Sequence, residues 1–154
     1  AHNNRGWHYL SRDDEEKAAA DFFRAIEINS SAPTTAAALV NLATVYERRD
    51  ENEDALELAA RARRQVSGYN RALRLEGGIY MRSKKYRLAG RKLLEAIRRD
   101  RYDYRSYNLL GCLLAEIGSE AEAEKYFRKA ARLNPDAAAP RENLEKLKPA
   151  IRDQ

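Results

Sequence analysis

Apolar residues recur along this chain with the spacing of a helix face. Residues 39–46 carry apolar side chains three or four positions apart, and the same spacing resumes over residues 55–62 after a polar break at 49–53. Because an α-helix has 3.6 residues per turn, each segment places its apolar side chains on one side. The polar break is long enough only for a turn. The pattern therefore predicts a hairpin of two antiparallel helices.

The hairpin pattern occurs four times. Small residues stand in pairs twelve positions apart, and another alanine follows seven positions after each pair, at Ala25, Ala62, Ala96 and Ala130, which are 37, 34 and 34 residues apart. The pairs are Gly6 and Ala18, Ala43 and Ala55, Gly77 and Ala89, and Gly111 and Ala123. Repetition at such a period is typical of stacked helical hairpins, because one hairpin cannot bury its apolar face alone.

Helix packing explains why small residues recur in these pairs. Two helices can approach closely where both carry a small residue, and larger side chains then fill the space on either side. A bulky residue stands three positions before the repeated alanine in three repeats, as Phe22, Leu93 and Phe127, whereas the second repeat has Ala59. We expect each small residue to mark a helix crossing.

This spacing resembles the tetratricopeptide-repeat family. The last repeat matches the family pattern through Tyr107, Leu110, Gly111, Leu114, Gly118, Ala123, Phe127, Ala130 and Pro135. The resemblance implies an all-α fold, a right-handed superhelical solenoid of about four antiparallel helix hairpins. We expect one domain over 1–154, with a partial first repeat at about 1–32, further repeats at about 36–69, 70–103 and 104–137, and a linker of three extra residues within Ser30–Thr35.

The sequence predicts a capping helix at the C-terminal end and an incomplete repeat at the N-terminal end. A short helix is predicted at about 138–148, where Leu144 and Leu147 would cap the exposed end of the stack. The first helix begins only just before Gly6, and the chain does not start with Met. We therefore expect a piece of a longer or processed protein.

Composition supports helices and argues against an enzyme. The chain has 26 Ala and 17 Leu against 12 Val, Ile and Thr together, and helices favour the former. Its single cysteine, Cys112, cannot form an internal disulfide, which leaves the compartment undetermined and slightly favours a reducing one such as the cytoplasm. The only histidines, His2 and His8, stand near the terminus without metal-ligand spacing or a neighbouring nucleophile. No catalytic residue, metal or cofactor is predicted, and no membrane insertion.

The net charge of +5 is unevenly distributed. Residues 61–105 hold 15 Lys and Arg against 4 Asp and Glu, so +11, and the rest of the chain holds 14 against 20, so −6. One interpretation is nucleic-acid binding through this basic block, with Arg91, Lys92, Arg98 and Arg99 as contacts beside Tyr102. Another is a structural segment of a longer solenoid within a multiprotein assembly.

The resemblance also implies a binding surface, because the first helix of each family hairpin lines a concave groove that takes a peptide or a partner helix. The matching positions here are Trp7, Asn41, Thr44, Arg48, Arg71, Arg74, Gly78, Met81, Arg82, Arg105, Asn108 and Cys112. Arg71, Arg74 and Arg82 share one helix face, and guanidinium groups grip carboxylates in pairs of hydrogen bonds. We therefore expect a non-catalytic adaptor or assembly scaffold that binds an acidic extended segment or helix of another protein.

One family ligand fits poorly. Some members hold the terminal carboxylate of chaperone tails through a five-residue clamp of Lys, Asn, Asn, Lys and Arg. Here Asn41 matches and Arg71 keeps the charge, but Asn3, Trp7 and Leu75 stand at the other three places. The sequence argues against that ligand, and it leaves the partner and the oligomeric state undetermined.

Overall fold

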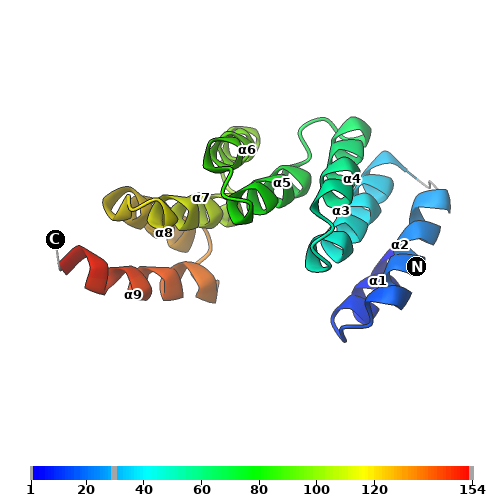
Figure 1. The fold of residues 1–154 in the computed structure, drawn as a ribbon, viewed down its shortest axis with the longest axis horizontal. Coiled ribbons are helices and arrows are strands. Elements are labelled where there is room, and N and C mark those ends of the chain that lie inside the picture. The colour runs from blue at the N-terminus through cyan, green and yellow to red at the C-terminus, as the bar shows by residue number, and fades with distance from the viewer. Residues whose placement is uncertain (1, 29–30, 153–154) are drawn as a thin grey trace. The chain divides into compact units, whose positions relative to one another are not determined.

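The computed structural model describes residues 2–28 and 31–152, and these form nine α-helices and no strand (Figure 1). The helices are α1 (His2–Leu10), α2 (Glu15–Ile28), α3 (Ala32–Arg48), α4 (Asn52–Gln65), α5 (Asn70–Arg82), α6 (Tyr86–Arg99), α7 (Tyr104–Glu116), α8 (Glu120–Leu133) and α9 (Ala138–Arg152). The predicted all-α architecture of repeated hairpins is confirmed. Contacts divide the chain into two compact units, Ala1–Ile79 and Tyr80–Gln154, with the boundary inside α5.

Each hairpin turns through one residue in the left-handed backbone region. These residues are Asp13, Asp50, Lys84 and Gly118, with φ of 59°, 62°, 56° and 81°. In each turn the next backbone N–H donates to the carbonyl five residues earlier, at 2.8 to 3.0 Å. This bond satisfies a carbonyl left open at the end of the first helix, as in a Schellman motif. The turns therefore repeat at the same 37, 34 and 34 residue intervals as the packing alanines.

The first unit buries one core between α1, α2, α3, α4 and the start of α5. Its largest fully buried apolar side chains include Phe22, Leu39 and Leu42. Arg63 of α4 also donates to Glu76 of α5, with Nε 3.0 Å from Oε1, and Glu76 is 3% exposed. This pairing with Arg63 offsets part of the free-energy cost of removing the Glu76 carboxylate from water.

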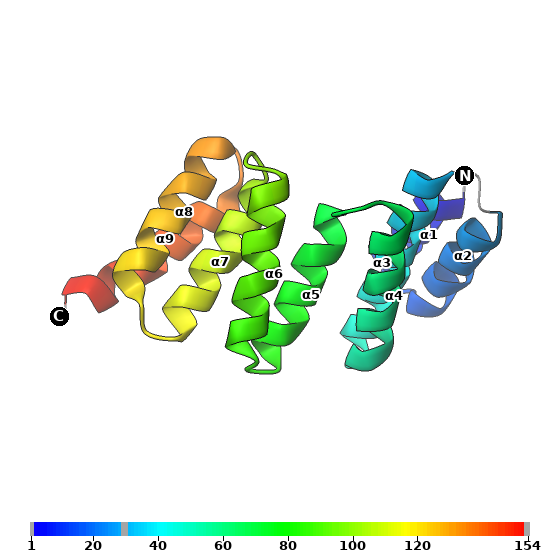
Figure 2. The same cartoon turned by 90° about the horizontal axis from the view of Figure 1, so that it is seen from above.

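The second unit buries two smaller clusters. Leu93, Leu110 and Leu113 pack between α6 and α7, and Phe127 of α8 packs against α7 and α9. Figure 2 shows these helices from above. Leu147 of α9 is buried and Leu144 is half-buried in the Phe127 cluster, so α9 covers the end of the α7–α8 hairpin as predicted.

Glycine is required at two of the helix crossings. A Cβ on Gly6 would lie 2.5 Å from Cε1 of Phe22, and one on Gly111 would lie 2.6 Å from Cε1 of Phe127. Normal carbon–carbon contacts are about 3.5–4.0 Å, so neither position has room for a side chain. Both rings are buried. The predicted role of these small residues, which lets two helices approach closely, is confirmed.

The predicted linker Ser30–Thr35 is wrong over residues 32–35. Helix α3 already begins at Ala32, with Ser31 as its N-cap, where the side chain accepts from the Thr34 N–H. Pro33 is tolerated there because the first turn of a helix does not use its N–H groups internally. The extra residues therefore lengthen α3, and Ser30 lies outside the described residues.

Candidate protein-binding site

A ladder of polar side chains crosses three helices of the first unit. Asn41 of α3 donates from Nδ2 to Oδ1 of Asn3 on α1, at 2.8 Å, and its Oδ1 accepts from Nη2 of Arg71 on α5, at 2.6 Å. Asn41 is fully buried, and Arg71 is half-buried. We call the side of α1, α3 and α5 that carries Asn3, Asn41 and Arg71 the ladder face.

Arg71 is in no ion pair with any residue that the structure describes. Its hydrogen-bond acceptor is a neutral amide, and a guanidinium has five N–H donors. One donor group is fixed by Asn41, so others remain for a ligand. A planar cation held in this way suits a carboxylate, which can accept two parallel hydrogen bonds.

Arg48 lies in a different environment on α3. Its Nη2 is 2.6 Å from Oδ1 of Asp13, its Nε is 3.5 Å from Oε1 of Glu15, and Nη1 donates to the Leu10 carbonyl at 3.3 Å. These contacts hold the α1–α2 turn against α3. Because two carboxylates already surround the guanidinium, Arg48 adds little positive charge to the ladder face.

The other expected positions in the first unit surround the ladder. Trp7 follows Asn3 by one helical turn and is 43% exposed, so its ring is available beside the ladder. The Thr44 hydroxyl donates to the Val40 carbonyl at 2.9 Å. Arg74 is half-buried, and a Cβ on Gly78 would meet no atom within 4 Å, so the space beside α5 is open there.

The second unit holds the remaining expected positions. Asn143 of α9 donates from Nδ2 to Oδ1 of Asn108, at 3.0 Å, and lies 3.4 Å from Sγ of Cys112. Helix α9 therefore already contacts both residues. Arg105 is exposed, with its guanidinium 5.3 Å from the ring centre of Tyr104. Met81 packs against the Leu93 cluster, and Arg82 is exposed.

The thiol of Cys112 is held in its neutral form. Burial raises the pKa of Cys112, and this effect outweighs the opposing influence of the nearby Lys146 charge. Thiolate is the nucleophilic form of cysteine, so the side chain is poorly suited to nucleophilic chemistry. Within the described chain, no group of three or more His, Cys, Asp and Glu side chains could hold a metal ion.

The sequence did not reveal the polar contacts of α1. Both Nε and Nη2 of Arg5 lie 2.6 Å from the carboxylate of Asp21, which is 3% exposed, and Nδ1 of His2 is 3.3 Å from the same group. The hydrogen bonds from Arg5 lower the pKa of Asp21. His2 therefore belongs to the contact between α1 and α2. In the sequence, this contact could have been suspected only from the i, i+3 spacing of His2 and Arg5, which places both side chains on one face of α1.

The basic block includes five cations on α6. Arg91, Arg98 and Arg99 are exposed there, and Tyr102 after the helix is 82% exposed. Lys92 is half-buried. Of the helices described, none combines the length and the apolar composition needed to cross a bilayer.

Comparisons with known proteins identify the repeats. Tetratricopeptide-repeat family models match residues 104–137 and 40–103. The type IV pilus assembly protein PilF of Pseudomonas aeruginosa is 34% identical over 131 residues, which is 84% of this chain and 51% of that protein. This chain thus spans about half the length of that relative.

Solved structures show the same fold. The structure of P. aeruginosa PilF has a TM-score of 0.83 at 29% identity, over 99% of this chain and 68% of that chain. A thermophilic TPR protein of Thermus thermophilus has a TM-score of 0.84 at 20% identity, over 97% of this chain and 81% of that one. The first TPR of Spaghetti (RPAP3), bound to the HSP90 peptide SRMEEVD, has a TM-score of 0.69 at 18% identity, over 77% and 94%. The chain belongs to the tetratricopeptide-repeat family.

Proposed function

We propose that this chain is a non-catalytic scaffold that binds an acidic segment of another protein on the ladder face, with Arg71 as the anchor. Tetratricopeptide repeats and the similar structures support a protein-interaction scaffold in general. The acidic ligand is our inference from Arg71, whose half-buried guanidinium donates to an amide and not to a carboxylate. Similarity to a pilus assembly protein supports a role in building a larger protein assembly.

The ladder supplies the preorganisation that binding requires. A free arginine loses rotamer freedom when it binds a ligand, whereas Arg71 is already held by Asn41, which Asn3 holds in turn. The exposed ring of Trp7 adds an apolar contact on the same face. We therefore expect a ligand in which an Asp or Glu meets Arg71 and an apolar residue meets Trp7.

The test is affinity capture from a lysate of the source cells, with and without nuclease. The baits are the wild-type chain, the variant Arg71→Glu with Arg74→Glu, and the control Arg24→Glu, which reverses an exposed charge on α2. A protein retained after nuclease by the wild type and the control, and lost with the double variant, supports the proposal. Equal retention by all three baits contradicts it.

Once a partner is captured, its affinity for the ladder face is measured. The partner's acidic segment is synthesised, and its affinity is measured against the wild type and Arg71→Gln, which keeps a donor for Asn41 but removes the charge. We expect about a tenfold loss, equivalent to about 1.4 kcal/mol. Replacing the segment's Asp and Glu by Asn and Gln should remove most of the difference between the two proteins.

Nucleic-acid binding is the alternative, and it is favoured by Tyr102, which is exposed and follows Arg98 and Arg99 closely in the sequence. In that case the captured material is nuclease-sensitive, is held equally by the wild type and the Arg71 variant, and is lost with Arg98→Glu and Arg99→Glu. Its affinity should also fall steeply with salt, because phosphate contacts release counterions.

A further inference from the structure

An apolar groove lies between α6 and α7 in the second unit, and it shares no residue with the ladder face. Its volume is about 670 Å³. The apolar lining consists of Leu94, Ile97, Leu110, Leu113, Leu114 and Ile117. Leu94 is 45% exposed and Ile117 is 48% exposed, which is unusual for large aliphatic side chains that lie together.

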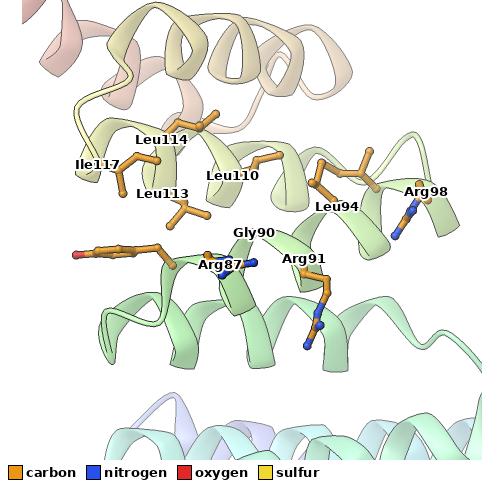
Figure 3. A pocket seen from close by; sticks show the side chains of 11 residues that line it. Arg87, Gly90, Arg91, Leu94, Arg98, Leu110, Leu113, Leu114 and Ile117 are labelled. Atoms are coloured by element: carbon orange, nitrogen blue, oxygen red, sulfur yellow. The ribbon is translucent and has the colours of Figure 1, made fainter.

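Gly90 keeps the groove open at its centre. A Cβ at this position would stand 3.5 Å from Cδ2 of Leu113, which is an ordinary contact distance. A larger side chain would extend into the space that the groove now leaves open. Figure 3 shows Gly90 between Leu110 and Leu113 of α7 and Arg87 and Arg91 of α6.

A row of cations runs beside the apolar lining. Arg87, Arg91 and Arg98 line the groove (Figure 3). Within the described residues, none of the three is in an ion pair. The nearby carboxylate of Glu116 instead accepts from the Tyr86 hydroxyl, with Oε1 and Oη 3.1 Å apart. The groove therefore has an apolar floor and an edge on which three arginines line up, with Glu116 near one end.

The dimensions fit a helix. Gly90, Leu94 and Ile97 follow one another by four and three positions, so they form one apolar stripe along α6. From Arg87 to Arg98 the edge runs eleven residues, which is about 16 Å or three helical turns. An amphipathic helix laid along α6 could bury its apolar positions against this stripe and place carboxylates against the arginines.

We propose that this groove is a second docking site, which takes an acidic amphipathic helix of another protein. The helix has apolar residues at i, i+3 or i+4, and i+7, and it has Asp or Glu on the flank that faces α6. Charge complementarity selects this occupant, because guanidinium groups pair with carboxylates while the aliphatic floor excludes water from around them. A nucleic acid would engage the arginines and leave Leu94 and Ile117 exposed. The site is independent of the ladder face.

Peptide selection tests the proposal directly. A phage-displayed library of random 14-residue peptides is selected on the wild-type chain and counter-selected on Gly90→Leu, in which the leucine fills the groove. Leucine favours a helix more than glycine does, and circular dichroism and thermal unfolding confirm that the variant folds. We expect enriched peptides with helical apolar spacing and more Asp and Glu than the starting library.

The strongest peptide is then synthesised with a fluorescent label, and its binding is measured by anisotropy. We expect Gly90→Leu to weaken binding at least about tenfold and Arg91→Glu about three- to tenfold, the latter loss shrinking as salt is raised. The matched controls are Gly78→Leu, at a helical glycine with open space, and Arg71→Glu on the ladder face. Both should bind the peptide like the wild type.

Three results would overturn the proposal. The first is that no peptide survives counter-selection, or that survivors carry no excess of acidic residues. The second is that Gly90→Leu and Gly78→Leu bind the peptide equally. The third is sedimentation evidence that the wild-type chain self-associates and that Gly90→Leu abolishes the association, because the groove would then be an interface between copies of this chain.

Discussion

The close approach of α7 and α8 at Gly111 makes a stability prediction that can be worked out from distances. An alanine Cβ at this position would lie 2.6 Å from Cε1 and 2.7 Å from Cδ1 of Phe127. The ring must move about 1 Å to restore a normal contact. Phe127 is 2% exposed, so any such movement displaces its neighbours in the cluster with Ala123 and Leu147.

Two opposing effects set the magnitude. Overpacking a core costs about 1–3 kcal/mol, and an overlap of this size belongs in the upper part of that range. Replacing glycine by alanine inside a helix gains about 1 kcal/mol. We therefore expect Gly111→Ala to lower the free energy of unfolding by about 1–2 kcal/mol.

Gly78→Ala is the matched control. This glycine is also helical, but an added Cβ meets no atom within 4 Å, so only the helix gain of about 1 kcal/mol remains. The two variants should differ by about 2–3 kcal/mol in urea unfolding followed by circular dichroism. A difference below about 0.5 kcal/mol would refute the packing argument. Adding Phe127→Leu to Gly111→Ala should recover part of the loss, because the smaller side chain leaves room for the Cβ.

Three further predictions concern single residues. Hydrogen bonds from Arg5 lower the folded-state pKa of Asp21 below its ordinary value of about 3.9, so the Asp21 carboxylate contributes its full stability above about pH 4 and loses it as the pH falls through the folded pKa. The difference in free energy of unfolding between the wild type and Asp21→Asn should therefore shrink when urea unfolding is repeated from about pH 5 to pH 2. A constant difference would contradict this account. Lys84 has a φ of 56°, a left-handed backbone conformation that costs a side-chain-bearing residue about 1–2 kcal/mol and costs glycine nothing. Lys84→Gly should therefore raise the free energy of unfolding by about 1 kcal/mol, and an unchanged urea midpoint would count against this backbone strain. Burial raises the pKa of Cys112, so less of its thiol is in the reactive thiolate form. Its reaction with a disulfide reagent at pH 8 should therefore be slower than that of free cysteine and should accelerate in urea. Equal rates in the native and the urea-unfolded protein would contradict the burial.

The fold could be predicted from the sequence because the residues that make it recur. Each hairpin needs a small residue at its crossing and a left-handed turn, and both features return at the same intervals. The second repeat departs from the pattern at Ala59. That change is consistent with the same geometry, since Ala43 already supplies a Cβ where Gly6 and Gly111 supply none, and Ala59 stands where those repeats place a phenylalanine.

The site could be predicted only in part, because its contacts do not recur. Asn41 was expected to face a ligand, and the structure places it in a buried ladder with Asn3 and Arg71. The groove beside Gly90 depends on how α6 packs against α7, and Leu94 and Ile117 are ordinary helical leucine and isoleucine in the sequence. Repeat periodicity reports which residues pack, and it carries no information on contacts that one pair of helices makes once.

Arg71 and Arg105 show how one repeat position can acquire two roles. They stand 34 residues apart at the same place in their repeats, but Arg71 is half-buried and held at 2.6 Å by Asn41, whereas Arg105 is exposed beside the ring of Tyr104. A held guanidinium loses little entropy on binding, whereas an exposed charge acts mainly by attracting its partner from a distance. With an acidic ligand on the ladder face, we therefore expect Arg71→Gln mainly to speed dissociation and Arg105→Gln mainly to slow association. Stopped-flow measurements at low and physiological salt separate the two rates, and a slower association as the main effect of Arg71→Gln would show that the ladder does not anchor the ligand.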